Sequence, residues 1–235
     1  MRKNFFILII ICVIALTGCS NVVENADSDI FLEEQNLEGI ATENVQPSNL
    51  GNVQAEEVAK VIFAESSWAF NVSDPSAVCE HADYLLKIRV KTKEKTKFFV
   101  KKSGMPARTY NVEVLDVLMN DDGNISKNIK LVVNGGIVSM QEFIDTKDEE
   151  TKLKFNADKL TKKELEEMIL IHDDSYYELM QDQEYYIFVR DLTDNDIFKG
   201  YYSMPDGGYD VFQEKNGEYI NVLTDAKLDV EMLSQ

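Results

Sequence analysis

Short runs of β-branched and aromatic residues, separated by turn-forming residues, dominate the chain from residue 84 onward. Such runs favour β-strands, and the Gly, Asn and Asp clusters between them favour tight turns. Asn216-Gly217 is a typical two-residue hairpin turn. The pattern predicts a mainly β domain of the α+β class with antiparallel strands. The predicted strands are Tyr84–Thr92, Arg108–Met119, Asn128–Asn134, Glu184–Leu192, Ile197–Ser203, Tyr209–Glu214 and Glu218–Leu223.

Two other segments have helical spacing. Between Gln54 and Trp68, apolar residues recur at roughly helical intervals, which predicts an N-terminal helix. Thr161-Lys-Lys-Glu164 has the capping-box pattern, in which two side chains satisfy free amides at a helix start. Apolar residues follow it on one helical face, so we expect one inserted helix over Lys162–Ile171.

The N-terminus has the pattern of an export signal. Arg2 and Lys3 precede Phe5–Leu16, an uninterrupted apolar run of twelve residues. A bilayer-spanning helix needs about 20 apolar residues, so a run this short behind a basic start indicates a signal peptide.

The apolar run ends in Leu16-Thr17-Gly18-Cys19. This resembles the lipobox of bacterial lipoproteins, which has an aliphatic residue, two small residues and a cysteine. The resemblance implies cleavage between Gly18 and Cys19 and attachment of lipid, including palmitate, to Cys19. Two or more acyl chains hold a protein stably on a bilayer. We therefore expect a lipid-anchored protein on the outer face of the cell membrane. The alternative is an ordinary signal peptide with a coincidental cysteine.

Composition divides the chain into three parts. We expect residues 1–18 to be the signal peptide, and residues 19–52, which are polar and have no steady period, to be a flexible tether. Residues 53–235 are expected to form a single domain. Heavy use of Ile, Lys, Asn and Asp is typical of a low-GC Gram-positive bacterium.

Cysteine usage leaves no intramolecular disulfide. Cys12 is removed with the signal and Cys19 carries lipid, so Cys79 is left without a partner. The fold must then depend on its apolar core. Cys79 is interpreted as a small buried residue, and a reactive thiol or an intermolecular link remains an alternative.

Two stretches carry a family resemblance. The first has Ala82-Asp83 before a strand and then Tyr110-Asn-Val112-Glu-Val114; the second has Gly207-Gly208-Tyr-Asp-Val-Phe212. They resemble secreted Gram-positive proteins of unknown function with an OB-like barrel, similar to netrin and tissue-metalloproteinase-inhibitor modules. The resemblance spans roughly residues 78–223 and implies the fold alone. Such modules are usually disulfide-bonded, and the inhibitors use a free N-terminal cysteine amine, which lipidation would block here.

The sequence contains no recognisable catalytic or metal-binding constellation. Cys79-x-His81 with Asp83 lacks the second ligand pair of a structural metal site, and His172 continues an apolar face. Nucleophile, zinc-protease and phosphate-loop motifs are missing. We therefore expect a non-catalytic binding domain without cofactor or metal. The alternative is an envelope-acting hydrolase whose carboxylate pair meets only in space.

Six cations at alternate positions form the sharpest local feature. Strand side chains alternate between faces, so this strip is expected on one side of the sheet. It could bind wall teichoic acid, anionic lipid headgroups or an acidic protein. The alternative is a solvated face opposite acidic residues such as Glu113 and Asp116. A formal net charge of −18 disfavours nucleic acid. The basic strip consists of Lys87, Arg89, Lys91, Lys93, Lys95 and Lys97.

Aromatic residues in two places could stack on sugars. Tyr201-Tyr202 and Tyr209–Phe212 stand near Gly-containing segments of predicted strands. We interpret them first as core and hairpin packing.

Overall fold

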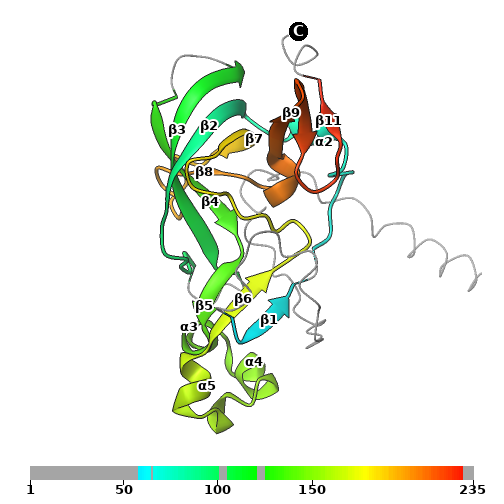
Figure 1. Cartoon of the computed structure of the whole chain (residues 1–235). Helices are drawn as coiled ribbons and strands as arrows, with labels where there is room; N and C mark the ends of the chain where they lie inside the picture. The colour runs from blue at the N-terminus through cyan, green and yellow to red at the C-terminus, as the bar shows by residue number, and fades with distance from the viewer. Residues whose placement is uncertain (1–57, 65, 101–104, 121–124, 230–235) are drawn as a thin grey trace, which may run out of the picture. The chain divides into compact units, whose positions relative to one another are not determined.

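The computed structural model describes residues 58–64, 66–100, 105–120 and 125–229 (Figure 1). All of them belong to one structural unit, Glu34–Gln235. The predicted signal peptide, the cleavage site at Gly18 and Cys19, and the tether lie outside the described residues. Among the helices that are described, none has the length and apolar character needed to cross a membrane.

Five strands close into a barrel. They are β2 (Tyr84–Lys93), β3 (Ala107–Met119), β4 (Asn128–Asn134), β7 (Glu184–Asp191) and β8 (Tyr202–Ser203). Strand β2 pairs antiparallel with β3 and β7, β3 pairs antiparallel with β4, and β8 runs parallel to β4. An antiparallel β7–β8 pairing completes the ring. The mainly β, OB-like fold is therefore confirmed.

Alternation along the strands builds the core of the barrel. On β2, Leu86, Ile88 and Val90 are fully buried, whereas the cations between them are half-buried or exposed. The register places Ile88 opposite Val114 on one side and Tyr185 on the other. Burying one such side chain contributes about 1.5–3 kcal/mol, so a run of alternating apolar residues fixes which face points inward.

A second sheet of three strands continues from the barrel. This sheet contains β1 (Lys60–Phe63), β5 (Gly136–Ser139) and β6 (Met168–His172), with β6 in the centre. Strand β1 is parallel to β6 and β5 is antiparallel to it. Gly135, at φ 83°, joins β4 to β5 in a backbone region that favours glycine.

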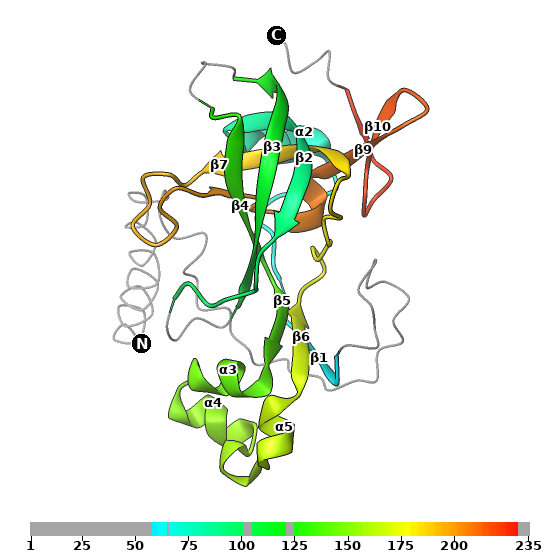
Figure 2. The same cartoon turned by 60° about the vertical axis from the view of Figure 1, so that its left-hand side comes forward.

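Three short helices connect β5 to β6. They are α3 (Met140–Asp145), α4 (Glu149–Lys154) and α5 (Lys162–Glu166), with the 3-10 turn η2 (Ala157–Lys159) between α4 and α5. Figures 1 and 2 both show them gathered at one end of the second sheet. The capping box of α5 is present, since Thr161 and Glu164 exchange side-chain and backbone hydrogen bonds.

Both helix predictions need correction. The N-terminal helix expected over Gln54–Trp68 begins outside the described residues, and where the structure describes it, Lys60–Phe63 is strand β1. The inserted helix expected over Lys162–Ile171 ends at Glu166, and strand β6 follows. Strand β6 is covered on both faces, so its apolar run is continuous, and periodicity alone does not separate such a strand from a buried helix.

The C-terminal segment extends the barrel sheet. After the 3-10 turn η3 (Gly207–Asp210), β9 (Val211–Lys215) pairs with β7, and β10 (Glu218–Asn221) and β11 (Lys227–Leu228) follow outward. Asn216 and Gly217 take φ values of 57° and 82°, which confirms the predicted hairpin turn. Helix α2 (Pro75–Glu80) precedes the barrel.

Candidate functional site

The basic strip lies on the outer face of the barrel, as expected. Lys87, Arg89, Lys91 and Lys93 alternate with core residues of β2 and point away from the interior. Lys95 and Lys97 follow β2 in the connection to β3. The backbone of Lys97 pairs with Ala107 through two hydrogen bonds of 3.0 and 2.8 Å. All six cations therefore lie on β2 or close to the start of β3.

Two glutamates on the neighbouring strands neutralise the first half of the strip. Glu184 on β7 pairs with Lys87 at 3.4 Å and with Arg89. Glu113 on β3 pairs with Lys91 at 2.6 Å. Hydrogen bonds from these cations lower the pKa of both carboxyls. This is the compensated face that the alternative interpretation expected, with Glu113 as one of its acids.

The next two cations also meet carboxylates. Lys93 Nζ lies 2.6 Å from Glu178 Oε1, and Lys95 Nζ lies 3.1 Å from Glu142 Oε1 on α3. The Lys95–Glu142 pair is exposed, and such a pair is worth roughly 0–1 kcal/mol. Glu178 is buried. Both pairs leave less charge for a ligand. Five of the six cations in the strip are thus paired.

Lys97 differs, because aromatic rings surround it. Its Nζ lies 3.2 Å from Tyr201 Oη and 4.6 Å from the ring centroid of Phe99. Lys130 on β4 approaches the same tyrosine, with its Nζ 5.7 Å from the Tyr201 centroid, while Lys97 Nζ is 5.5 Å away. We call Lys97, Lys130, Tyr201 and Phe99 the basic–aromatic cluster.

Neither lysine of this cluster forms an ion pair with any residue that the structure describes. Both lysines act electrostatically on Glu94, whose carboxylate accepts hydrogen bonds from Thr109 Oγ1 at 2.9 Å and Asn111 Nδ2 at 3.1 Å. Those hydrogen bonds, and then the charges of Lys130 and Lys97, lower the pKa of Glu94. The two ammonium groups keep donors free for an external anion, held beside rings that attract cations.

The sequence pointed to Lys97 and to Tyr201 separately, and it missed Lys130. Tyr201 is half-exposed and contacts both lysines, whereas Tyr202 is buried in the barrel wall. Lys130 belongs to a strand far along the chain, and only barrel closure brings it to Tyr201. An exposed lysine in an alternating strand carries no local signal for such a contact.

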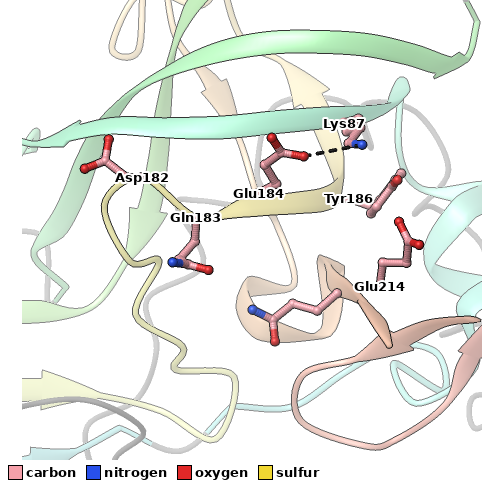
Figure 3. Close-up of a pocket in the computed structure, with 7 residues that line it drawn as sticks. Lys87, Asp182, Gln183, Glu184, Tyr186 and Glu214 are labelled. Carbon is pink, nitrogen blue, oxygen red and sulfur yellow. Dashed lines mark ion pairs between the residues drawn. The ribbon is translucent and has the colours of Figure 1, made fainter. Parts of the chain in front are cut away.

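A polar hollow of about 370 Å³ lies at the other end of the strip (Figure 3). Figure 3 shows Glu184 and Glu214 entering it from different strands. Arg89 and Lys87 lower the pKa of Glu184, which is the opposite of what a general acid needs. The Tyr186 ring is occupied by Lys87 at 5.4 Å and Tyr219 at 4.3 Å, so it offers no stacking surface. The hollow is lined by Lys87, Asp182, Gln183, Glu184, Tyr186, Gln213 and Glu214.

The other candidate side chains are engaged in packing. The His81 ring stacks on Phe70 with centroids 4.2 Å apart, and Cys79 Sγ lies 3.3 Å from Met119 Sδ. Burial raises the pKa of the Cys79 thiol, which makes it less reactive. No group of three or more potential metal ligands occurs within the described ranges. Phe212, one of the possible sugar-stacking residues, is fully buried against Phe188.

Comparison with known proteins found no matching family model, no matching curated protein and no matching solved structure. The assignment of the OB-like fold therefore depends on strand order and pairing within this chain.

Proposed function

We propose that this chain is a lipid-anchored, non-catalytic binding domain on the outer face of the cell membrane. Its ligand is an anionic component of the envelope, such as a phosphate-rich wall polymer or lipid headgroups. The basic–aromatic cluster makes the contact. The lipobox-like segment ending in Cys19 supports the location. The two lysines, which form no ion pair with a described residue, support the choice of ligand.

The observation that carries the proposal is the contrast within the basic strip. Glutamates form ion pairs with Lys87, Lys91, Lys93 and Lys95. In contrast, Lys97 and Lys130 both approach the ring of Tyr201. A phosphate or carboxylate between two ammonium groups gains from both. It displaces no ion pair within the described part of the chain. A lysine near an anionic surface contributes about 1 kcal/mol.

The overall charge shapes how such binding behaves. The chain carries a formal net charge of −18, so a polyanion is repelled by most of its surface and held by one local area. Because the lysines are exposed, salt screens the attraction over about 10 Å at 0.1 M. Binding should therefore be moderate and strongly salt-dependent.

The test measures binding of soluble poly(glycerol phosphate) to the full-length protein in detergent, at low and high salt, with neutral dextran as the control ligand. The double variant Lys97→Gln/Lys130→Gln should bind at least about tenfold more weakly, since two contacts of about 1 kcal/mol are removed. The matched control Lys154→Gln/Lys215→Gln removes two exposed cations from α4 and β9 and should bind as the parent does. Equal binding by both double variants would refute the proposed surface.

A further inference from the structure

A pair of aspartates lies buried at the two ends of η3. Asp206 precedes the turn and is 4% exposed, and Asp210 ends it and is 0% exposed. The Asp206 backbone N–H donates to Asp210 Oδ2 at 2.7 Å. Asp206 Oδ2 and Asp210 Oδ1 are buried and accept no hydrogen bond from any described residue. Buried carboxylate oxygens without donors strongly disfavour the ionised form.

The elements packed around η3 bring few charges to the pair. His81, at the end of α2, and Arg190, on β7, are the charged or titratable groups that act on it. Arg190 directs its Nη2 and Nε donors to the His81 carbonyl oxygen, at 2.9 and 3.3 Å. Among the described residues, neither His81 nor Arg190 forms an ion pair with either aspartate. From β9, Val211 and Phe212 are apolar.

Strand β10 supplies a neutral amide. Asn221 Nδ2 donates to the carbonyl oxygens of Gly208 at 3.2 Å, Tyr209 at 2.8 Å and Val211 at 3.1 Å. These bonds hold the backbone of η3 and leave the two carboxyls untouched. Asn221 therefore ties the position of η3 to the β9–β10 hairpin.

A second contact holds η3 in place, and it is made with the segment that follows β6. The Gly208 N–H donates to the Ser175 carbonyl oxygen at 2.6 Å. Gly207, at φ 58°, lies so close that an added Cβ would meet Ser175 O at 2.7 Å. The turn η3 thus joins the C-terminal hairpin, the barrel and the Ser175 segment at one point.

Two uncompensated negative charges in this site would repel each other in a medium of low polarity. Burial raises the pKa of Asp206 to about 6, and burial together with the charge of Asp206 raises the pKa of Asp210 well above its usual range. The folded protein therefore retains at least one proton on the pair under mildly acidic conditions.

We propose that Asp206 and Asp210 form a proton-dependent lock that seats η3 and fastens the β9–β10 hairpin to the barrel. While the pair holds a proton, one carboxyl is neutral and η3 stays in place. When the last proton leaves, the buried site carries two negative charges, and η3 separates from the Ser175 segment. This inference stands apart from the proposed function, because it uses none of the residues of the basic–aromatic cluster.

The chain contains its own reporter for this movement. Trp68 is its only tryptophan, and its ring lies 5.9 Å from the ring of Tyr209 in η3, in an edge-on arrangement. The experiment records tryptophan emission of the full-length protein from pH 4.5 to 9. Emission should shift at a pH above about 6, because the pair loses its last proton only after the first has left. Hydrogen exchange of residues 204–211, corrected for the intrinsic pH effect, should accelerate over the same range.

Asp210→Asn is the decisive variant. Its amide oxygen can still accept the Asp206 N–H, but it cannot ionise, so the emission shift and the exchange change should both disappear. Asp206→Asn should do the same and covers the case in which the first variant folds poorly. Asp174→Asn is the matched control, because Asp174 is another carboxyl close to Trp68 with a raised pKa. The proposal is overturned if the parent shows no transition, or if only Asp174→Asn removes it.

Discussion

Arg108 Nη1 lies 3.3 Å from Glu178 Oε2, and the guanidinium is completely buried. Nη1 also donates to the Tyr177 carbonyl oxygen at 2.7 Å, while Nη2 donates to the Asn134 carbonyl at 2.9 Å and Nε to the Gly135 carbonyl at 3.2 Å. These carbonyls belong to the point where β4 passes into β5 and to the segment before β7. Arg108 on β3 therefore links the β4–β5 junction to the segment before β7, and Glu178 neutralises its buried charge.

Replacing Glu178 by Ala should destabilise the protein by about 3–5 kcal/mol, because it leaves a buried guanidinium without its carboxylate. The free energy of unfolding in urea measures the effect. Glu218→Ala is the control, since its ion pair with Lys227, at 2.6 Å, is largely exposed. That control should change stability by less than about 1 kcal/mol. Similar losses in both variants would contradict the role assigned to the buried pair.

Asp210→Asn should stabilise the protein at pH 8 and leave it little changed at pH 4. The raised pKa values mean that the folded state holds more protons than the unfolded state above pH 3.8, the ordinary aspartate value. The free energy of unfolding of the parent therefore falls as the pH rises from about 4 through 6 and beyond. Urea unfolding of both proteins at each pH should show this slope in the parent and a flatter one in the variant. An unchanged slope would argue against a buried, protonated pair.

Gly207→Ala should cost more stability than Gly217→Ala. Both glycines have positive φ, 58° and 82°, so each substitution brings a conformational strain of roughly 1 kcal/mol. A Cβ at Gly207 would also meet the Ser175 backbone, whereas at Gly217 it meets open space. Thermal unfolding of the two variants isolates the close packing of η3. Equal melting temperatures would contradict it.

Glu184→Gln should strengthen binding of poly(glycerol phosphate) a few-fold. The change releases Lys87 and leaves Arg89 with only its 3.9 Å contact to Glu113, so the same outer face of the barrel becomes more positive. Glu214→Gln removes one carboxylate from the same hollow without breaking an ion pair within the described residues, and it should have a smaller effect. Equal gains would mean that net charge alone governs binding.

Cys19→Ala should abolish incorporation of a palmitate label and release the protein from the membrane fraction. In a lipobox the lipid is attached to the sulfur of the cysteine, and alanine has no sulfur. The measurement combines metabolic labelling with fractionation of cells that express the variant. Cys79→Ala is the control and should keep both the label and the membrane association. Continued labelling of Cys19→Ala would refute the lipoprotein assignment.

The sequence alone determined the strands whose side chains alternate between a packed face and a solvated face. Strands β2, β3, β4, β7, β9 and β10 were all predicted within a few residues of their bounds, because a two-residue apolar period and Gly or Asn turns are local signals. The predicted strand Ile197–Ser203 is reduced to β8, Tyr202–Ser203. The hairpin turn at Asn216-Gly217 and the capping box at Thr161 were equally local and are confirmed.

The tertiary structure decided the features that depend on contacts between residues far apart in the sequence. The apolar run of β6 became a strand because β1 and β5 flank it, and no local period distinguishes that outcome from a helix. Only the barrel brings Lys130 to Tyr201 and sets glutamates opposite most of the basic strip. The burial of Asp206 and Asp210 likewise follows from packing against distant segments, since in sequence they are ordinary turn residues. The charge and the apolar period of a segment follow from its own residues, whereas its ion pairs and its burial depend on residues from other parts of the chain.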